Sequence, residues 1–158
     1  MKQFKKARGF TLIEILVVIG IIAILAAIVI IAINPARQFA QARDSQRESN
    51  VNTILNAVGQ GLADNKGVWA TGTTASCDAL PSSATEISSA NTDLACLTPT
   101  YIPSQLPTDP SVGTWTSDTN YDTGYTILQD TDGRVTVCAP EAANETAISG
   151  ATAICVTR

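Results

Sequence analysis

Hydrophobic side chains are concentrated in one unbroken run near the N-terminus. From Ile15 to Ile33, nineteen consecutive residues carry neither a charge nor a strongly polar group. At about 1.5 Å per residue the run predicts a helix of roughly 28 Å, close to the thickness of a bilayer core. A cleavable secretory signal, the alternative, has an apolar region of only about 7–15 residues. We therefore favour a membrane-spanning helix.

Beyond this run the pattern changes to that of an amphipathic helix. Pro35 lacks an N–H and its ring clashes with the preceding turn, so we expect a kink or a local loosening there. Asp44 and Arg47 are spaced to pair on a polar face. Gly67 is typical of a helix end, so the pattern predicts one helix of about fifty residues. Its outer half presents an apolar stripe that needs a covering layer: Val51, Ile54, Leu55, Val58 and Leu62.

The remaining residues predict loops and a small sheet. Between Thr71 and Thr92, ten of twenty-two residues are Ser or Thr with no regular period, which indicates a loop region. Two alternating runs, 125–129 and 134–138, flank a turn at 130–133 and predict a hairpin, and Ala151–Thr157 predicts a third strand. We expect an α+β fold in which an antiparallel sheet of about three strands covers the helix. Four prolines exclude a long regular element before it: Pro99, Pro103, Pro107 and Pro110.

Charge is distributed unevenly along the chain. The formal net charge is −4, yet the first eight residues contain no acid and four bases: Lys2, Lys5, Lys6 and Arg8. Because Lys and Arg beside a membrane helix tend to stay in the cytoplasm, we expect the N-terminus inside and the body outside. Beyond Glu48 there are eleven acids and three bases. An acidic body repels phosphate, which argues against nucleic acid as a partner.

The composition offers little for catalysis. Histidine is absent, so the commonest general base and the commonest metal ligand are missing. We expect no enzyme activity, no cofactor and no metal site. Residues 130–133 resemble the start of a calcium loop, but no bidentate glutamate follows and a hairpin turn explains them equally well. Residues 144–146 fit the N-glycosylation pattern, and a polar loop is the alternative.

Four cysteines lie beyond the apolar run and form no C-x-x-C pair: Cys77, Cys96, Cys138 and Cys155. An even number in a segment outside the membrane favours two disulfides in an oxidising compartment over a zinc or redox site. Four free buried thiols are the alternative.

The alternation of side chains predicts how these cysteines pair. Cys138 lies on the opposite face of its run from the valines at 135 and 137. Cys155 likewise points away from the apolar residues at 154 and 156. If both apolar rows face the helix, the two sulfurs oppose one another on neighbouring strands, within reach of a bridge. We predict disulfides Cys138–Cys155 and, for the remaining pair, Cys77–Cys96.

The most specific signal is the segment Lys5-Lys6-Ala7-Arg8-Gly9-Phe10-Thr11-Leu12-Ile13-Glu14. A basic stretch, a glycine, a phenylalanine and a lone glutamate before an apolar run resemble the prepilin leader of type IV pilins and of type II secretion pseudopilins. The resemblance implies a pilin-like fold with four parts. These are a leader (1–9), a transmembrane and assembly half of the helix (10–34), an amphipathic half (35–66) and an extracytoplasmic head (67–158).

The resemblance also implies roles for single residues. Gly9 would be the last leader residue, cut by a membrane aspartic peptidase, and Phe10 would become an N-methylated N-terminus. Glu14 would pair with the Phe10 amine of an adjacent subunit and so fix register during assembly; a side chain that extends to the lipid headgroups is the alternative. Pro35 would supply the helix break that family members often carry.

These features favour a structural subunit of a type IV pilus-like filament. Its implied partners are further copies of itself, the prepilin peptidase, a platform protein, an assembly ATPase and, before assembly, membrane lipid. It would lie in the cell membrane and then in an extracellular or periplasmic filament. One alternative is a type II secretion pseudopilin, because residues 106–110 resemble a stretch of major pseudopilins, without the Trp-Gly that often follows. Another is a minor pilin that displays an adhesive head.

Overall fold

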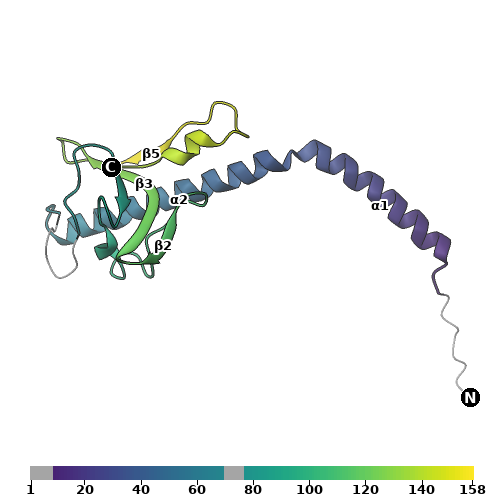
Figure 1. Ribbon diagram of the computed structural model, residues 1–158, viewed down its shortest axis with the longest axis horizontal. Helices are drawn as coiled ribbons and strands as arrows, with labels where there is room; N and C mark the ends of the chain where they lie inside the picture. Colours follow the sequence, from purple (N-terminus) through teal and green to yellow (C-terminus); the bar gives the residue numbers. More distant parts are fainter. Residues whose placement is uncertain (1–8, 70–76) are drawn as a thin grey trace, which may run out of the picture. The chain divides into compact units, whose positions relative to one another are not determined.

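The computed structural model describes residues 9–69 and 77–158, so all of the expected leader except Gly9 lies outside the described residues. The chain divides into two compact units, one that ends at Gln38 and one that comprises Phe39–Arg158. Figure 1 traces the elements in chain order. They are α1 (Leu12–Ile33), α2 (Pro35–Asp64), β1 (Thr85–Ser88), the 3-10 helix η1 (Ala95–Leu97), β2 (Thr114–Ser117), β3 (Asn120–Gln129), β4 (Val135–Ala139), the 3-10 helix η2 (Pro140–Asn144) and β5 (Ile154–Thr157).

The long helix predicted from the sequence is interrupted at Asn34. This residue has φ 45° and ψ 80°, in the left-handed region, and Pro35 is the first residue of α2. A residue before proline is disfavoured in the α conformation, asparagine tolerates the left-handed region, and proline suits the first position of a helix. The chain therefore has two helices rather than one of about fifty residues.

The second helix buries the apolar stripe that the sequence predicted. Val51, Ile54 and Val58 are fully buried, and Leu55 is 2% exposed. The helix ends at Asp64, and Gly67 follows with φ 84° while its N–H donates to the Leu62 carbonyl at 2.7 Å. A glycine in this conformation satisfies one of the last carbonyls of the helix and stops it.

The sheet has five strands rather than about three. Its order is β1-β3-β4-β5, with every pairing antiparallel, and β2 also pairs with β3. Asp122 of β3 pairs with both Ser88 of β1 and Thr114 of β2, so these two strands lie on opposite edges of β3. The α+β class is confirmed, and the number of strands is corrected.

The two unforeseen strands have weak sequence patterns. β1 has the sequence Thr-Glu-Ile-Ser, with one apolar residue, Ile87, and β2 has the sequence Thr-Trp-Thr-Ser, with one apolar residue, Trp115. Neither alternates apolar and polar residues over the length that a strand signal requires. β2 forms because β3 is ten residues long and offers partners at Asn120–Asp122, before the predicted run 125–129, whereas β1 pairs mainly with Thr126 and Ile127 of that run, on the edge of β3 opposite β4.

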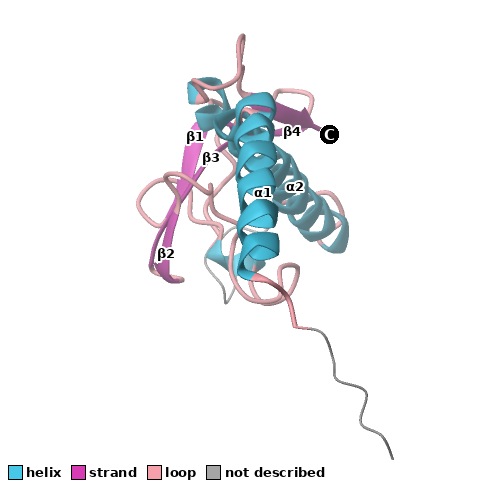
Figure 2. Ribbon diagram, turned by 90° about the vertical axis from the view of Figure 1, so that its right-hand side faces the viewer, coloured by secondary structure: helices cyan, strands magenta, loops and turns pink. Residues whose placement is uncertain are grey.

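Within the second unit, α2 and the sheet form two layers around one core (Figure 2). Val135 and Val137 of β4 are buried, whereas Thr136 and Cys138 lie partly exposed on the opposite face. This is the alternation that the sequence predicted for β4. The core is completed by buried side chains of the strands and loops: Ile87, Leu94, Leu97, Ile102, Leu106, Tyr121, Tyr125, Ile127 and Ala139.

Candidate functional site

The first candidate site is the surface of α1. Its 22 residues contain a single charged side chain, that of Glu14, and no residue of this fully described helix is buried. The mean hydropathy of its most apolar window is 3.5, and within the described residues it is the one helix long and apolar enough to cross a membrane. A helix that is apolar all round needs lipid or other protein around it. Exposure of this apolar surface of α1 to water would be unfavourable.

Thr11 and Glu14 form the first turn of this helix. The Glu14 amide donates to Thr11 Oγ1 at 3.3 Å, and Glu14 Oε2 accepts from the Thr11 amide and hydroxyl, each at 2.8 Å. This reciprocal arrangement is a capping box, which satisfies backbone N–H groups that a helix start leaves without partners. Within the described part of the chain, Oε1 of Glu14 accepts no hydrogen bond. One carboxylate oxygen is therefore available to an external donor.

The residues at the expected cleavage point are open to approach. Phe10 is 85% exposed, and a Cβ built on Gly9 would meet no atom within 4 Å. Among the described residues, none approaches Gly9 closely enough to require glycine at this position.

Pro35 lies where the sequence analysis expected a helix break. The Arg37 N–H donates both to the Asn34 carbonyl, at 3.1 Å, and to Asn34 Oδ1, at 3.4 Å. The side chain of Asn34 thus caps the start of α2 while its backbone ends α1.

A second polar centre lies inside the head and was not foreseen. Arg47, expected on a polar face with Asp44, is 1% exposed. Its Nε donates to Asp109 Oδ2 at 2.7 Å, and its Nη1 donates to Asp44 at 2.9 Å and to Glu145 at 2.5 Å. Its Nη2 donates to Ser111 Oγ at 2.8 Å and to Asp109 Oδ1 at 3.3 Å. All five donors of the guanidinium are thus engaged, and α2 is joined to two loops.

Arg43 extends this network to the surface. It donates from Nε to Glu145 Oε1 at 2.7 Å and from Nη2 to Glu145 Oε2 at 2.5 Å. The bonds from Arg43 and Arg47 outweigh the effect of burial and lower the pKa of Glu145 to about 2. Burial alone would raise the pKa of Asp109, but its bonds from Arg47 and Ser111 hold that pKa below its ordinary value.

A signal for this network was present in the sequence. Asp109 lies between Pro107 and Pro110, and Gly113 follows closely. A Cβ on Gly113 would lie 2.5 Å from the Asp109 amide nitrogen, so the loop closes tightly around that residue. Arg47 lies four and seven residues before Val51 and Ile54, and this spacing places it on the buried side of α2; its acidic partners have no such mark in the sequence.

The structure pairs the cysteines as the sequence analysis proposed. Cys77 and Cys96 form one bridge, with Cα atoms 5.3 Å apart, and Cys138 and Cys155 form the other, with Cα atoms 4.1 Å apart. Cys138 and Cys155 are directly opposite in the β4–β5 ladder. This register is the one that strand alternation predicted.

The acidic turn between β3 and β4 is held by its own polar groups. Asp130 accepts the amides of Asp132 and Arg134, each at 2.9 Å, and its other oxygen accepts Nε of Arg134 at 2.9 Å. These bonds, led by the Arg134 amide, lower the pKa of Asp130.

Within the described residues, no group of three or more Cys, Asp or Glu residues is arranged to hold a metal ion. In the N-glycosylation pattern, the middle residue, Glu145, is buried by its ion pairs, while Asn144 and Thr146 are exposed.

Comparison with known proteins bears on the N-terminal unit alone. Residues 4–32 match the family described as the prokaryotic N-terminal methylation motif. No curated protein and no solved structure matches the chain significantly. The match covers Gly9, Phe10, Thr11 and Glu14 together with most of α1. Over residues 4–32 this chain therefore carries the prokaryotic N-terminal methylation motif, the prepilin-type leader of type IV pilins and pseudopilins.

Proposed function

We propose that this protein is the structural subunit of a type IV pilus-like filament. The observation that carries the proposal is the methylation motif followed by a fully exposed apolar helix with one charge, Glu14. In this account the peptidase cuts between Gly9 and Phe10, and the new N-terminus is methylated. The processed chain stays in the membrane through α1 until it joins the filament.

Burial of α1 against other copies drives assembly. Side chains between 50% and 84% exposed run along the helix, for example Ile15, Ile24 and Ile31. Because α1 passes into the filament from lipid rather than from water, close packing of these side chains and polar pairing between copies stabilise the filament and set its register. Glu14 supplies the polar pairing through Oε1, with the Phe10 amine of an adjacent copy as its partner.

The orientation follows from charge and cysteine chemistry. The bases at positions 2, 5, 6 and 8 keep the N-terminus in the cytoplasm. Both cysteine pairs belong to the head, where disulfides need an oxidising compartment. The head therefore lies outside the cytoplasm. A platform protein and an ATPase supply the work of assembly, as the resemblance implies.

One observation favours a second candidate, a pseudopilin of type II secretion. Residues 106–110 resemble major pseudopilins, and Asp109 within them is fixed by the buried Arg47. The two candidates share cleavage, methylation and polymerisation. They differ in whether the filament extends from the cell surface and in whether its loss blocks protein secretion.

A deletion strain tests both candidates. Cells are sheared, the released filaments are collected and examined by electron microscopy, and the subunit is identified by mass spectrometry. A pilus subunit gives surface filaments that contain this chain and vanish on deletion, with protein secretion unchanged. A pseudopilin gives no sheared filaments, and its deletion blocks secretion of proteins into the medium. The proposal would be contradicted if wild-type cells, with intact pilus and type II secretion systems, contained the processed chain but never in a polymer.

A further inference from the structure

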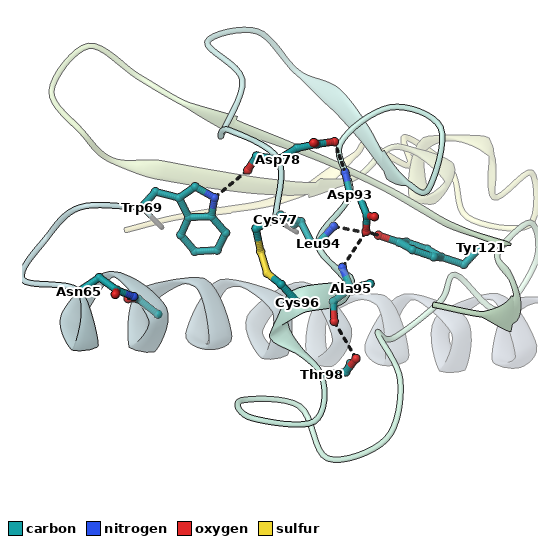
Figure 3. The surroundings of a disulfide bond; sticks show 11 residues. Asn65, Trp69, Cys77, Asp78, Asp93, Leu94, Ala95, Cys96, Thr98 and Tyr121 are labelled. Atoms are coloured by element: carbon teal, nitrogen blue, oxygen red, sulfur yellow. Dashed lines mark hydrogen bonds between the residues drawn. A yellow bond between two sulfur atoms is a disulfide. The ribbon is translucent and has the colours of Figure 1, made fainter. Parts of the chain in front are cut away.

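The two disulfides of the head differ in how far they are reachable from solvent. Cys77 is 6% exposed and belongs to the hydrophobic core, and Cys96, which is partly exposed like Cys138, packs against that core. Figure 3 shows this bridge between the segment of Cys77 and the segment that contains η1. Cys155 is exposed and Cys138 partly exposed, on the face of the sheet opposite the core.

Hydrogen bonds of neighbouring residues also hold the segments that carry the buried bridge (Figure 3). The Asp78 amide donates to the Asp93 carbonyl, and Asp78 Oδ2 accepts the Asp93 amide, both at 2.9 Å. Trp69 Nε1 donates to the Asp78 carbonyl at 2.8 Å. These bonds fix the backbone on both sides of the Cys77–Cys96 bridge. Because Cys77 is buried and the backbone on each side is held, a thiol reaches this bridge less readily than the bridge on the face of the sheet.

The exposed bridge lies at the edge of the sheet. Cys138 is opposite Thr126 of β3 on one side and opposite Cys155 of β5 on the other. Within the described sheet, β5 is a terminal strand, so no further strand lies beyond Cys155. In thiol–disulfide exchange the attacking thiolate approaches a sulfur along the extension of the S–S bond that breaks. A nucleophile can reach Cys155 from outside the edge, whereas the in-line approach to Cys138 passes over Thr126.

We propose that Cys155 is a site of thiol–disulfide exchange in the folded head, for a small thiol or an oxidoreductase with an exposed thiolate. The thiolate sulfur bonds to Cys155 Sγ, and the Cys138–Cys155 bond breaks with its electron pair on Cys138. Cys138 leaves as a thiolate and takes a proton from water. A second thiolate then attacks the sulfur that is bonded to Cys155. A disulfide forms between the two attacking thiols, and Cys155 leaves as a thiolate. The reverse sequence, with an oxidised dithiol as electron acceptor, installs the bridge.

The fold of the head survives this exchange. The Val135 amide donates to the Arg158 carbonyl at 2.7 Å, and the Arg158 amide donates to the Val135 carbonyl at 2.9 Å. The hydroxyls of Thr136 and Thr157 lie 2.8 Å apart and share a hydrogen bond. Because these contacts hold β5 without the sulfurs, the Cys138–Cys155 bridge can form last, on a head that is already folded. The Cys77–Cys96 bridge has to form while the core is still open.

Limited exchange with reduced glutathione tests this order. The full chain in detergent is incubated with glutathione, free thiols are trapped with iodoacetamide, and the peptides are mapped by mass spectrometry. We expect the glutathione adduct on Cys155 and the alkyl group on Cys138, with a rate more than about tenfold above that at the buried pair. Near-ultraviolet circular dichroism from Trp69 and Trp115 should stay unchanged.

Two double variants supply the controls. Cys138→Ser with Cys155→Ser leaves the buried bridge, which should react slowly and speed up in denaturant. Cys77→Ser with Cys96→Ser leaves the edge bridge; reaction there at the wild-type rate would support the proposal even if this variant is less stable. An adduct mainly on Cys138, equal rates at the two bridges, or loss of the tryptophan signal together with the first reduction would overturn it.

Discussion

The two helices carry the same kinds of apolar residue and use them in opposite ways. Ile24 of α1 is 65% exposed, whereas Ile54 of α2 is fully buried by the sheet and loops of its own chain. The head therefore buries its apolar residues within its own chain, whereas within the described residues no side chain of α1 is buried. In the proposed function this difference separates a head that folds from a helix that assembles.

The charged groups of the two regions differ in the same way. Arg47 engages all five of its donors within the head, and within the described residues no buried side-chain nitrogen or oxygen lacks a partner. Glu14 uses Oε2 for its own helix, and among the described residues Oε1 accepts no hydrogen bond. The Arg47 network stabilises the head internally, whereas in the proposed function Glu14 pairs with an adjacent copy.

The largest effect is expected from Glu14→Leu. The variant makes α1 more apolar, so membrane insertion and cleavage should persist, but the partner of the incoming N-terminus is lost. We expect filaments to disappear in electron micrographs of sheared material while processed subunit remains on a blot. Glu48→Leu removes an exposed acid of α2 and should leave filament yield unchanged. Normal yield from Glu14→Leu would refute the role of this carboxylate.

Arg47→Met should destabilise the head strongly. Removal of the guanidinium leaves Asp109 buried without a counter-charge and leaves Glu145 paired with Arg43 alone, a loss of about 3–5 kcal/mol in the free energy of unfolding. Arg134→Met breaks exposed pairs and should cost less than about 1 kcal/mol. Urea unfolding of the full chain in detergent, followed by tryptophan fluorescence, measures both. Similar losses in the free energy of unfolding for the two variants would show that the Arg47 network stabilises the head no more than exposed ion pairs do.

Ile54→Ala and Ile24→Ala compare the two apolar surfaces directly. The first leaves a cavity in the core and should lower the free energy of unfolding of the head by about 2–5 kcal/mol. The second alters an exposed side chain of α1 and should leave head unfolding unchanged. The same urea titration compares them. A loss of head stability from Ile24→Ala would mean that α1 is not a separate unit.

Acid should weaken the head gradually through Glu145. Its folded pKa of about 2 lies below its ordinary value of 4.5, so its contribution to stability is present above pH 4.5. That contribution is lost as pH falls from 4.5 to 2, and Asp109, with its lowered pKa, adds to the same loss. Urea titrations between pH 6 and pH 2.5 measure this decline. Glu145→Gln should flatten the decline; an identical slope in the variant would contradict the assignment.

The sequence predicted the features that rest on local patterns. The apolar run, the α2 stripe and the β4–β5 register each follow from a period of side chains along one segment, as Val135 and Val137 illustrate. β1 could not be foreseen, because it is stabilised by pairing with β3, more than thirty residues further along the chain. β2 forms a hairpin with β3, but its sequence Thr-Trp-Thr-Ser has a single apolar residue and so gives no alternating pattern. The burial of Arg47 depends on Asp109 and Glu145, which lie 62 and 98 residues away along the chain. Such contacts leave no periodic trace.

The N-terminal residue of the mature chain tests the central claim most directly. The protein is expressed with an active prepilin peptidase, and the N-terminal peptide of the membrane fraction is sequenced by mass spectrometry. The account predicts a chain that begins with N-methyl-Phe10, and a Gly9→Val variant that begins at Met1. Wild-type protein recovered only at full length, or cut at another bond, would contradict it.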